Sequence, residues 1–238
     1  MQNKSQQGID YFNRGHWLTN IQVKTSLRAR RKMYELWKGF VVRESQKKEF
    51  PQSLRVVDIG ATPDCERQDS NCMLNWFLED KAQLALYSPE DVSNLTQKLP
   101  GVIVLQKMPS TPQFDWVTSS AVLEHVGTIK DQKSFVNSLS KTGNGLFLTT
   151  PNRWHWLEFH TKIPFLHWLP KKLHRALLKR FGLQFWANEK NLNLLGKKEL
   201  LKIADDLTTN FDVEIRSIKT LGMTSNWVLL ARRKSKKT

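Results

Sequence analysis

The chain of 238 residues is poor in cysteine and has no long apolar run. Its two cysteines, Cys65 and Cys72, have six residues between them. This spacing is typical of neither a zinc site nor a disulfide framework, so we expect a reducing, cytoplasmic compartment. No apolar run approaches the ~18 residues that a membrane-spanning helix needs. The first residues also contain no apolar core of a secretory signal, so we expect neither a spanning segment nor a leader.

Acidic residues are scarce relative to basic ones, and the imbalance is uneven. The chain has 37 Lys and Arg against 22 Asp and Glu, a net charge of +15. Residues 1–54 carry 11 basic and 4 acidic side chains, residues 55–150 carry 8 and 11, and residues 151–238 carry 18 and 7. Two basic arms therefore flank a slightly acidic centre. Such arms suit an anionic partner, namely nucleic acid, an acidic membrane surface or a phosphorylated substrate, but also an ordinary solvated surface.

The centre of the chain alternates short apolar segments with amphipathic ones. We predict strands at 55–60, 82–88, 102–106, 114–120 and 145–150, and helices at about 71–79, 91–98 and 121–140. This alternation is typical of an α/β protein with a doubly wound parallel sheet. A helix at 197–207 and a strand-turn-strand unit at 211–222 and 226–233 follow. Apolar residues at helical spacing predict a further helix over 17–48.

These elements suggest one domain with additions. We expect a helical N-terminal extension at 1–50 and a sheet domain at 51–233, with a basic tail at 234–238. Within the domain, residues 151–190 form an aromatic and basic insertion after the fifth strand. We find no internal repeat.

Several polar residues and glycines stand where predicted strands end. Open parallel sheets bind ligands at this edge, because strand ends and helix N-termini leave backbone donors free there. The first strand ends in VVDIG (56–60), the second is followed by Glu90 and Asp91, and the fourth turns abruptly into a helix through SSAVLEHV (119–126). We therefore expect a ligand at the carboxyl edge of the sheet.

Together these segments resemble a class I S-adenosylmethionine-dependent methyltransferase. The motifs are VVDIGATPD (56–64), FDWVTSSAVLEHVG (114–127) and GLFLTTPNR (145–153), with the terminal strand pair at 211–233. The block at 148–170 is similar to a methyltransferase type 11-like branch associated with bacterial envelope polysaccharides. The resemblance implies a Rossmann-like seven-stranded sheet, mostly parallel with the last strand antiparallel, and helices on both faces. It also implies S-adenosyl-L-methionine as cofactor.

The resemblance further implies roles for individual residues. Asp58 would orient the donor's ammonium group, and Gly60 would let the ligand approach the strand end. Either Glu90 or Asp91 would hold the ribose, and the other would cap a helix. The implied cofactor-binding residues are Asp58, Gly60, Ala61, Thr62, Glu90, Asp91, Ser119 and Ser120. Thr62 and Asp64 stand where the family's motif has its later glycines.

His125 has two interpretations, which the sequence leaves open. It is either the general base for a hydroxyl acceptor or a structural hydrogen-bonding residue in the strand-to-helix corner. The four histidines at 155, 160, 167 and 174 have separations of 5, 7 and 7, with prolines between them, so we expect no metal site.

The acceptor class also stays open. Residues 166–182 have the pattern of an amphipathic helix, which fits either contact with an anionic membrane or a lid over the acceptor site. We expect a small-molecule, saccharide or lipid-linked acceptor. The alternatives are an RNA-modifying methyltransferase, less favoured because no RNA-binding motif occurs, and a non-catalytic binding protein on a degenerate methyltransferase fold. The sequence does not indicate an oligomeric state.

Overall fold

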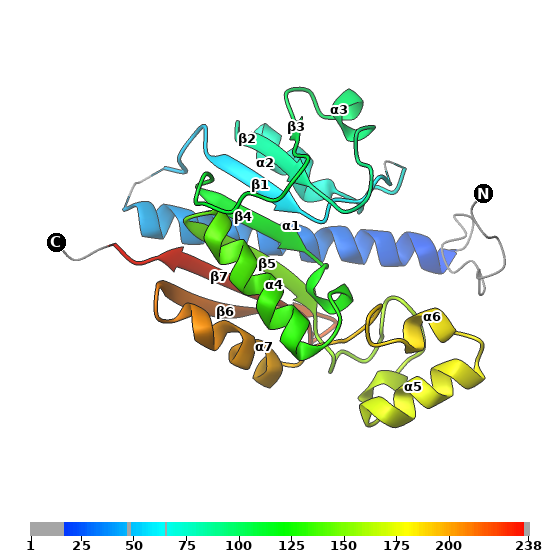
Figure 1. The fold of residues 1–238 in the computed structure, drawn as a ribbon. Helices are drawn as coiled ribbons and strands as arrows, with labels where there is room; N and C mark the ends of the chain where they lie inside the picture. The colour runs from blue at the N-terminus through cyan, green and yellow to red at the C-terminus, as the bar shows by residue number, and fades with distance from the viewer. Residues whose placement is uncertain (1–16, 47–48, 65, 236–238) are drawn as a thin grey trace.

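The structure is a computed structural model, and it describes residues 17–46, 49–64 and 66–235, with side chains from residue 23 onward. Cys65, the first 16 residues of the predicted N-terminal extension and the end of the basic tail (236–238) lie outside the described residues. Figure 1 shows a central twisted sheet covered by helices on both faces.

The sheet has seven strands in the order β3-β2-β1-β4-β5-β7-β6. Five of them run parallel to one another, and β7 pairs antiparallel with both β5 and β6. The predicted fold class, with its one antiparallel end, is confirmed. The strands are β1 (Arg55–Ile59), β2 (Gln83–Tyr87), β3 (Ile103–Val104), β4 (Trp116–Ser120), β5 (Gly145–Pro151), β6 (Phe211–Thr220) and β7 (Met223–Arg233).

The strand order reverses between β1 and β4. Chain connections leave these adjacent strands in opposite directions, so a crevice opens at their carboxyl ends. This is where the motifs of the sequence converge.

The helix α1 (Trp17–Ser45) lies along one face of the sheet together with α2 (Cys72–Glu79) and α3 (Leu95–Lys98) (Figure 1). Trp37 is fully buried in α1, stacks on Phe147 with ring centroids 5.7 Å apart, and meets Trp116 edge-on at 5.7 Å. Burial of aromatic side chains of this size contributes several kcal/mol to stability, by an order-of-magnitude estimate of ~25 cal/mol per Å². The helix predicted as an extension therefore forms one layer of the domain core.

The opposite face is covered by α4 (Ile129–Thr142) and α7 (Lys197–Ala204), which a short 3₁₀ turn, η4 (Asp205–Leu207), follows. Successive side chains along a strand point to opposite faces of the sheet. Val57 and Val117 pack on this face, whereas Val56 and Trp116 pack under α1. Both faces of the parallel strands are thus buried, as their near-continuous apolar sequences predict.

The structure differs from the predicted helix at 121–140. A 3₁₀ turn, η2 (Leu123–His125), follows β4, and the α-helix begins only at Ile129. The reason is local: Gly127 has φ +103°, and Thr128 caps α4 in a reciprocal capping box with Asp131. Residues 124 and 125 are consequently held in a turn at the edge of the sheet.

Residues 166–182 are likewise not one helix. They form a 3₁₀ turn, η3 (Leu166–Trp168), and then α5 (Lys171–Arg180), which begins directly after Pro170. With α6 (Gln184–Ala187), α5 makes a small separate cluster around Leu178 and Leu183, set to one side of the sheet (Figure 1). Among the described residues, no helix is both long and apolar enough to cross a bilayer.

Candidate functional site

The turn after β1 depends on Gly60. Its φ is +95°, a conformation that favours glycine, and its backbone N–H donates a 2.8 Å hydrogen bond to the carbonyl of Tyr87. A Cβ atom at this position would lie 2.5 Å from Cγ2 of Val122. From the sequence, the role expected of Gly60 was to let a ligand approach the strand end. The structure shows that the backbone conformation and the Val122 side chain already require it.

The loop after this turn is held by side-chain hydrogen bonds. The amide of Asn71 accepts from the N–H of Thr62 at 3.2 Å and donates to the carbonyls of Thr62 and Asp64 at 2.7 and 3.2 Å. Oδ1 of Asp64 accepts from the backbone N–H of Glu66 at 2.9 Å. Between residues 60 and 64 only Gly60 has positive φ. The loop therefore keeps its shape without the later glycines of the family motif.

Two adjoining cavities open at the carboxyl ends of β1 and β4. The smaller has a volume of about 120 Å³, and the predicted residues that line it are Asp58, Gly60, Ala61, Thr62 and Ser120. The larger has a volume of about 280 Å³ and lies between α1, the ends of β4 and β5, and the insertion. Four residues line both: Arg30, Thr62, Ser120 and Ala121.

Asp58 forms the floor of the smaller cavity. Its side chain is buried and accepts a 2.8 Å hydrogen bond from Oγ1 of Thr118. Burial raises the pKa of Asp58 to about 6, against the opposing effects of that hydrogen bond and of the nearby Arg30 cation. Arg30 reaches from α1 and approaches the hydroxyls of Ser26 and Ser120, both at 3.4 Å. An acid and a cation thus border the same small space.

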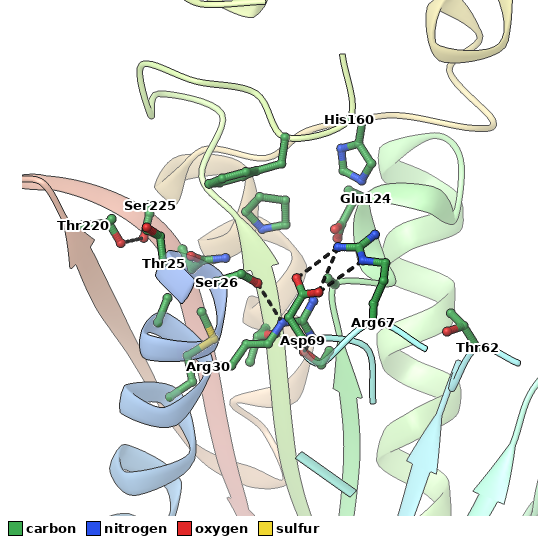
Figure 2. A pocket seen from close by; sticks show the side chains of 18 residues that line it. Thr25, Ser26, Arg30, Thr62, Arg67, Asp69, Glu124, His160, Thr220 and Ser225 are labelled. Atoms are coloured by element: carbon green, nitrogen blue, oxygen red, sulfur yellow. Dashed lines mark hydrogen bonds and ion pairs between the residues drawn. The ribbon is translucent and has the colours of Figure 1, made fainter. Parts of the chain in front are cut away.

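The larger cavity contains a second pair of charges. Arg67 forms two hydrogen bonds to Oδ1 and one to Oδ2 of Asp69, at 3.0 to 3.2 Å, and Asp69 is buried. Figure 2 shows this pair and Arg30 among the side chains that line the cavity, with Glu124 and His160 above Arg67 in the view. The cavity therefore has polar groups of both signs.

Three of the predicted cofactor residues line neither cavity. Ser119 is buried and donates a 2.8 Å hydrogen bond to the carbonyl of Ile59, which ties β4 to β1. Asp91 accepts a 2.9 Å hydrogen bond from the N–H of Ser93, and this bond lowers the pKa of its carboxyl group. Asp91 therefore stabilises the turn before α3, and both Asp91 and Glu90 are exposed.

His125 does not line either cavity; another histidine lies between it and the larger one. Nδ1 of His125 lies 2.6 Å from the carbonyl oxygen of Asn191, and Nε2 lies 3.1 Å from Nε2 of His160. His160 does line the larger cavity, as does Glu124, whose side chain is fully buried. Oε1 of Glu124 lies 4.0 Å from Nε2 of His125.

The other histidines of the insertion do not join this group. Nε2 of His167 lies 2.6 Å from the carbonyl oxygen of His155, and His174 is buried on α5. Burial lowers the pKa of His174 to about 4, so that its imidazole is neutral. His155, His167 and His174 therefore lie apart from the pair formed by His125 and His160.

Sequence reasoning did not find four of the polar groups in these cavities: Arg30, Asp69, Glu124 and His160. The sequence shows only a basic cluster at 28–32, although Ala29 and Met33 mark the buried face of that helix and place Arg30 at its border. His160 is brought to His125 by the path of the insertion, over 35 positions. No local pattern indicates such a contact.

Comparisons with known proteins bear on the fold alone. No protein-family model matches the chain, and no curated protein matches its sequence. The solved structures give the deciding observation. Magnesium protoporphyrin IX methyltransferase from Synechocystis superposes with a TM-score of 0.54 at 16% identity, over 94% of this chain and 97% of that one. The fold is that of the class I methyltransferases.

Two further structures set the limits of this likeness. The 1,6-didemethyltoxoflavin N1-methyltransferase of Burkholderia thailandensis, solved with its acceptor and S-adenosylhomocysteine, matches with a TM-score of 0.51 and 11% identity, over 92% and 88% of the two chains. A Rhodobacter sphaeroides protein provisionally described as a Zn-dependent alcohol dehydrogenase matches with a TM-score of 0.55 at 9% identity, over 89% of this chain and 98% of that one. The shared architecture therefore does not decide the activity, which has to be argued from the site.

Proposed function

We propose that the protein transfers a methyl group from S-adenosyl-L-methionine to a small-molecule acceptor. The observation that carries this proposal is the pair of adjoining cavities at the strand-order reversal between β1 and β4. Parallel sheets bind nucleotide-like ligands at this point. One cavity is bordered by the Gly60 turn and the Asp58 carboxylate, and the other offers separate room for an acceptor.

The smaller cavity fits the polar end of the donor. Its amino acid part carries an ammonium and a carboxylate, and the cavity offers Asp58 and Arg30 as partners of opposite sign. The backbone at Gly60, Ala61 and Thr62 would follow the ligand, and Glu90 remains for the ribose. When bound, the donor supplies an electrophilic methyl group on a sulfonium.

The larger cavity would hold the acceptor. Methyl transfer needs an in-line approach of the acceptor atom, which is chiefly a matter of proximity and orientation. The wall residues Phe159 and His160 come from the insertion, and Thr25 and Ser26 come from α1. Acceptor selection would therefore depend on the insertion and α1. His125 would contact an acceptor only through His160, so its structural role at the corner is favoured over that of a direct base.

We propose in addition that the insertion contacts anionic membranes and presents a lipid-linked or membrane-associated acceptor. Large apolar side chains that are about half exposed lie on or beside α5 and α6, next to basic residues. This combination is typical of interfacial binding. The apolar residues are Phe165, Leu173, Phe181 and Phe185, and the exposed basic ones are Lys172, Lys179 and Arg180.

Calorimetry with S-adenosylhomocysteine tests the proposed reaction, together with mass spectrometry of ligands that co-purify. We expect saturable binding at one site per chain, weakened at least about tenfold in Asp58→Asn, which leaves a neutral residue of the same shape. Absence of binding to the folded wild-type protein would instead support the non-catalytic alternative. Binding of RNA with steep salt dependence would favour the RNA-modifying alternative.

A further inference from the structure

We propose that Glu124, His125 and His160 form a binding site for a divalent transition-metal ion at the edge of the larger cavity. One ligand atom from each residue lies within 4.8 Å of the others, and no other such group of three occurs among the described residues. The two Nε2 atoms are 3.1 Å apart. Two nitrogens that each lie about 2.1 Å from one metal ion are themselves about 3.0 to 3.4 Å apart, so the imidazoles already have ligand spacing.

Both imidazoles are oriented by bonds at their other nitrogen. Nδ1 of His125 donates to the carbonyl of Asn191 at 2.6 Å, since a carbonyl oxygen only accepts. Nδ1 of His160 donates to the Glu158 carboxylate at 2.5 Å. Metal-binding histidines characteristically make this kind of outer bond to a carbonyl or carboxylate.

With a proton on each Nδ1, neutral imidazoles would point the lone pairs of their Nε2 atoms at one another. A proton shared between the rings would remove that repulsion. That proton would give no hydrogen bond to Oε1 of Glu124. This oxygen is buried, has no hydrogen-bond partner and lies 4.0 Å from Nε2 of His125. An unpartnered buried carboxylate oxygen costs free energy. A metal ion between the three residues would satisfy all three atoms at once.

The turn that carries two of the ligands is itself braced. Oε2 of Glu124 accepts from Oγ1 of Thr150 at 3.0 Å, which leaves Oε1 directed away from β5. Gln132 donates to the carbonyls of Leu123 and Asn193 at 2.9 Å, and the N–H of Asn193 donates to the carbonyl of Glu124 at 2.7 Å. The two imidazoles thus have ligand spacing before a metal ion arrives, which favours binding, and the Glu124 carboxylate has to approach them from 4.0 Å.

Two imidazole nitrogens and one carboxylate oxygen suit Zn²⁺ or Fe²⁺ better than Mg²⁺ or Ca²⁺, which prefer oxygen. Three protein ligands leave at least one coordination position open. Because Glu124 and His160 line the larger cavity, the open position faces the space assigned to the acceptor. An oxygen of the acceptor would complete the coordination. This last step rests on the proposed function, whereas the metal site does not.

The test measures metal binding directly. Purified wild-type protein, stripped with a chelator and dialysed, is titrated with Zn²⁺ by calorimetry and with Co²⁺ by visible absorption. We expect one ion per chain and Co²⁺ bands typical of nitrogen and oxygen ligands. The variants His125→Asn and His160→Asn place an amide where Nδ1 was, so they keep the outer hydrogen bond and delete the ligand. Glu124→Gln keeps an acceptor for Thr150. Each should weaken metal binding at least about tenfold.

The matched controls are His174→Asn and Glu199→Gln, which change a histidine and a glutamate outside the cluster and should bind the metal as wild type does. A wild-type protein that binds neither ion would overturn the proposal, as would metal affinity that all three ligand variants retain. Donor binding, measured separately with S-adenosylhomocysteine, reports on the proposed reaction. A wild-type protein that binds the metal ion but not S-adenosylhomocysteine would contradict the proposed reaction and leave the proposed metal site standing.

Discussion

Oγ1 of Thr118 donates a 2.8 Å hydrogen bond to Oδ2 of Asp58 and so joins β4 to β1 at the floor of the smaller cavity. The bond stabilises the ionised carboxylate, whereas burial favours the neutral acid, and burial has the larger effect. The stability of the domain and the candidate ligand site therefore both depend on Asp58.

The first prediction concerns stability against pH. The pKa of Asp58 is raised from 3.8 to about 6 in the folded chain, so the folded state binds a proton that the unfolded state releases between these values. This contribution to stability is fully present below about pH 4 and is lost as pH rises through 6. Asp58→Asn should match wild type near pH 4 and exceed its unfolding free energy at pH 8 by about 3 kcal/mol. Urea denaturation at both pH values measures the unfolding free energy of the two proteins. A difference between variant and wild type that is the same at pH 4 and pH 8 would contradict the prediction.

The second prediction concerns donor affinity against pH. The ammonium of S-adenosylhomocysteine should favour the ionised form of Asp58, so affinity should rise as pH increases towards 6 and then level off. The rise should approach about tenfold per pH unit below 6, and it should be absent in Asp58→Asn. Calorimetry between pH 5 and pH 8 gives both curves. A wild-type curve as flat as that of the variant would remove Asp58 from the site.

The third prediction separates Arg30 from Asp58 by the choice of ligand. Arg30 borders the smaller cavity and would pair with the donor's carboxylate. Arg30→Met keeps the aliphatic stem and removes the cation. The variant should bind S-adenosylhomocysteine at least about tenfold more weakly than wild type does. Its affinity for 5′-methylthioadenosine, which has no carboxylate, should be nearly unchanged. Equal losses for both ligands would indicate a general disturbance of α1.

The fourth prediction is a double-mutant cycle at the β1 turn. Gly60→Ala meets both an unfavourable φ of +95° and the Val122 side chain, and we expect it to cost about 2 to 4 kcal/mol. Val122→Ala removes both γ-methyl groups, so in this background Gly60→Ala should cost only the backbone strain of about 1 to 2 kcal/mol. Chemical denaturation of the four proteins measures the coupling. Strict additivity would show that the clash is relieved elsewhere.

The fifth prediction concerns the insertion. The wild-type protein should co-sediment with vesicles of anionic lipid more than with zwitterionic ones, and less at high salt. Lys172→Glu/Lys179→Glu should abolish the preference, whereas Lys198→Glu/Lys202→Glu on α7, the same change of charge elsewhere, should keep it. No lipid preference at low salt would favour the lid interpretation of residues 166–182.

The sequence predicts the sheet well, because buried parallel strands are short apolar runs that end in turn residues. β1, β2 and β5 begin or end within one residue of their predicted bounds. The helix after β4 is predicted too early, since an apolar sequence at helical spacing continues through Val126. The deciding signals are the glycine at 127 and the capping Thr128, which start the helix anew.

The site is predicted only in part, for a physical reason. Asp58 and Gly60 follow from strand-end position, which is local. Contacts such as His125 with His160, or Arg30 with Ser120, join positions 35 and 90 residues apart and depend on tertiary packing. The insertion histidines do not form a group among themselves. One of them meets a histidine from another part of the chain.

The clash between a residue-60 side chain and Val122 has an evolutionary consequence. A glycine that the chain needs for its own backbone is retained whether or not anything binds beside it. A descendant that had lost its ligand would still be selected to keep this glycine for as long as it folded. Gly60 therefore carries no information about ligand binding, and a survey of relatives that sought to separate ligand-binding proteins from non-binding ones would have to compare the residues at positions 58 and 30 instead.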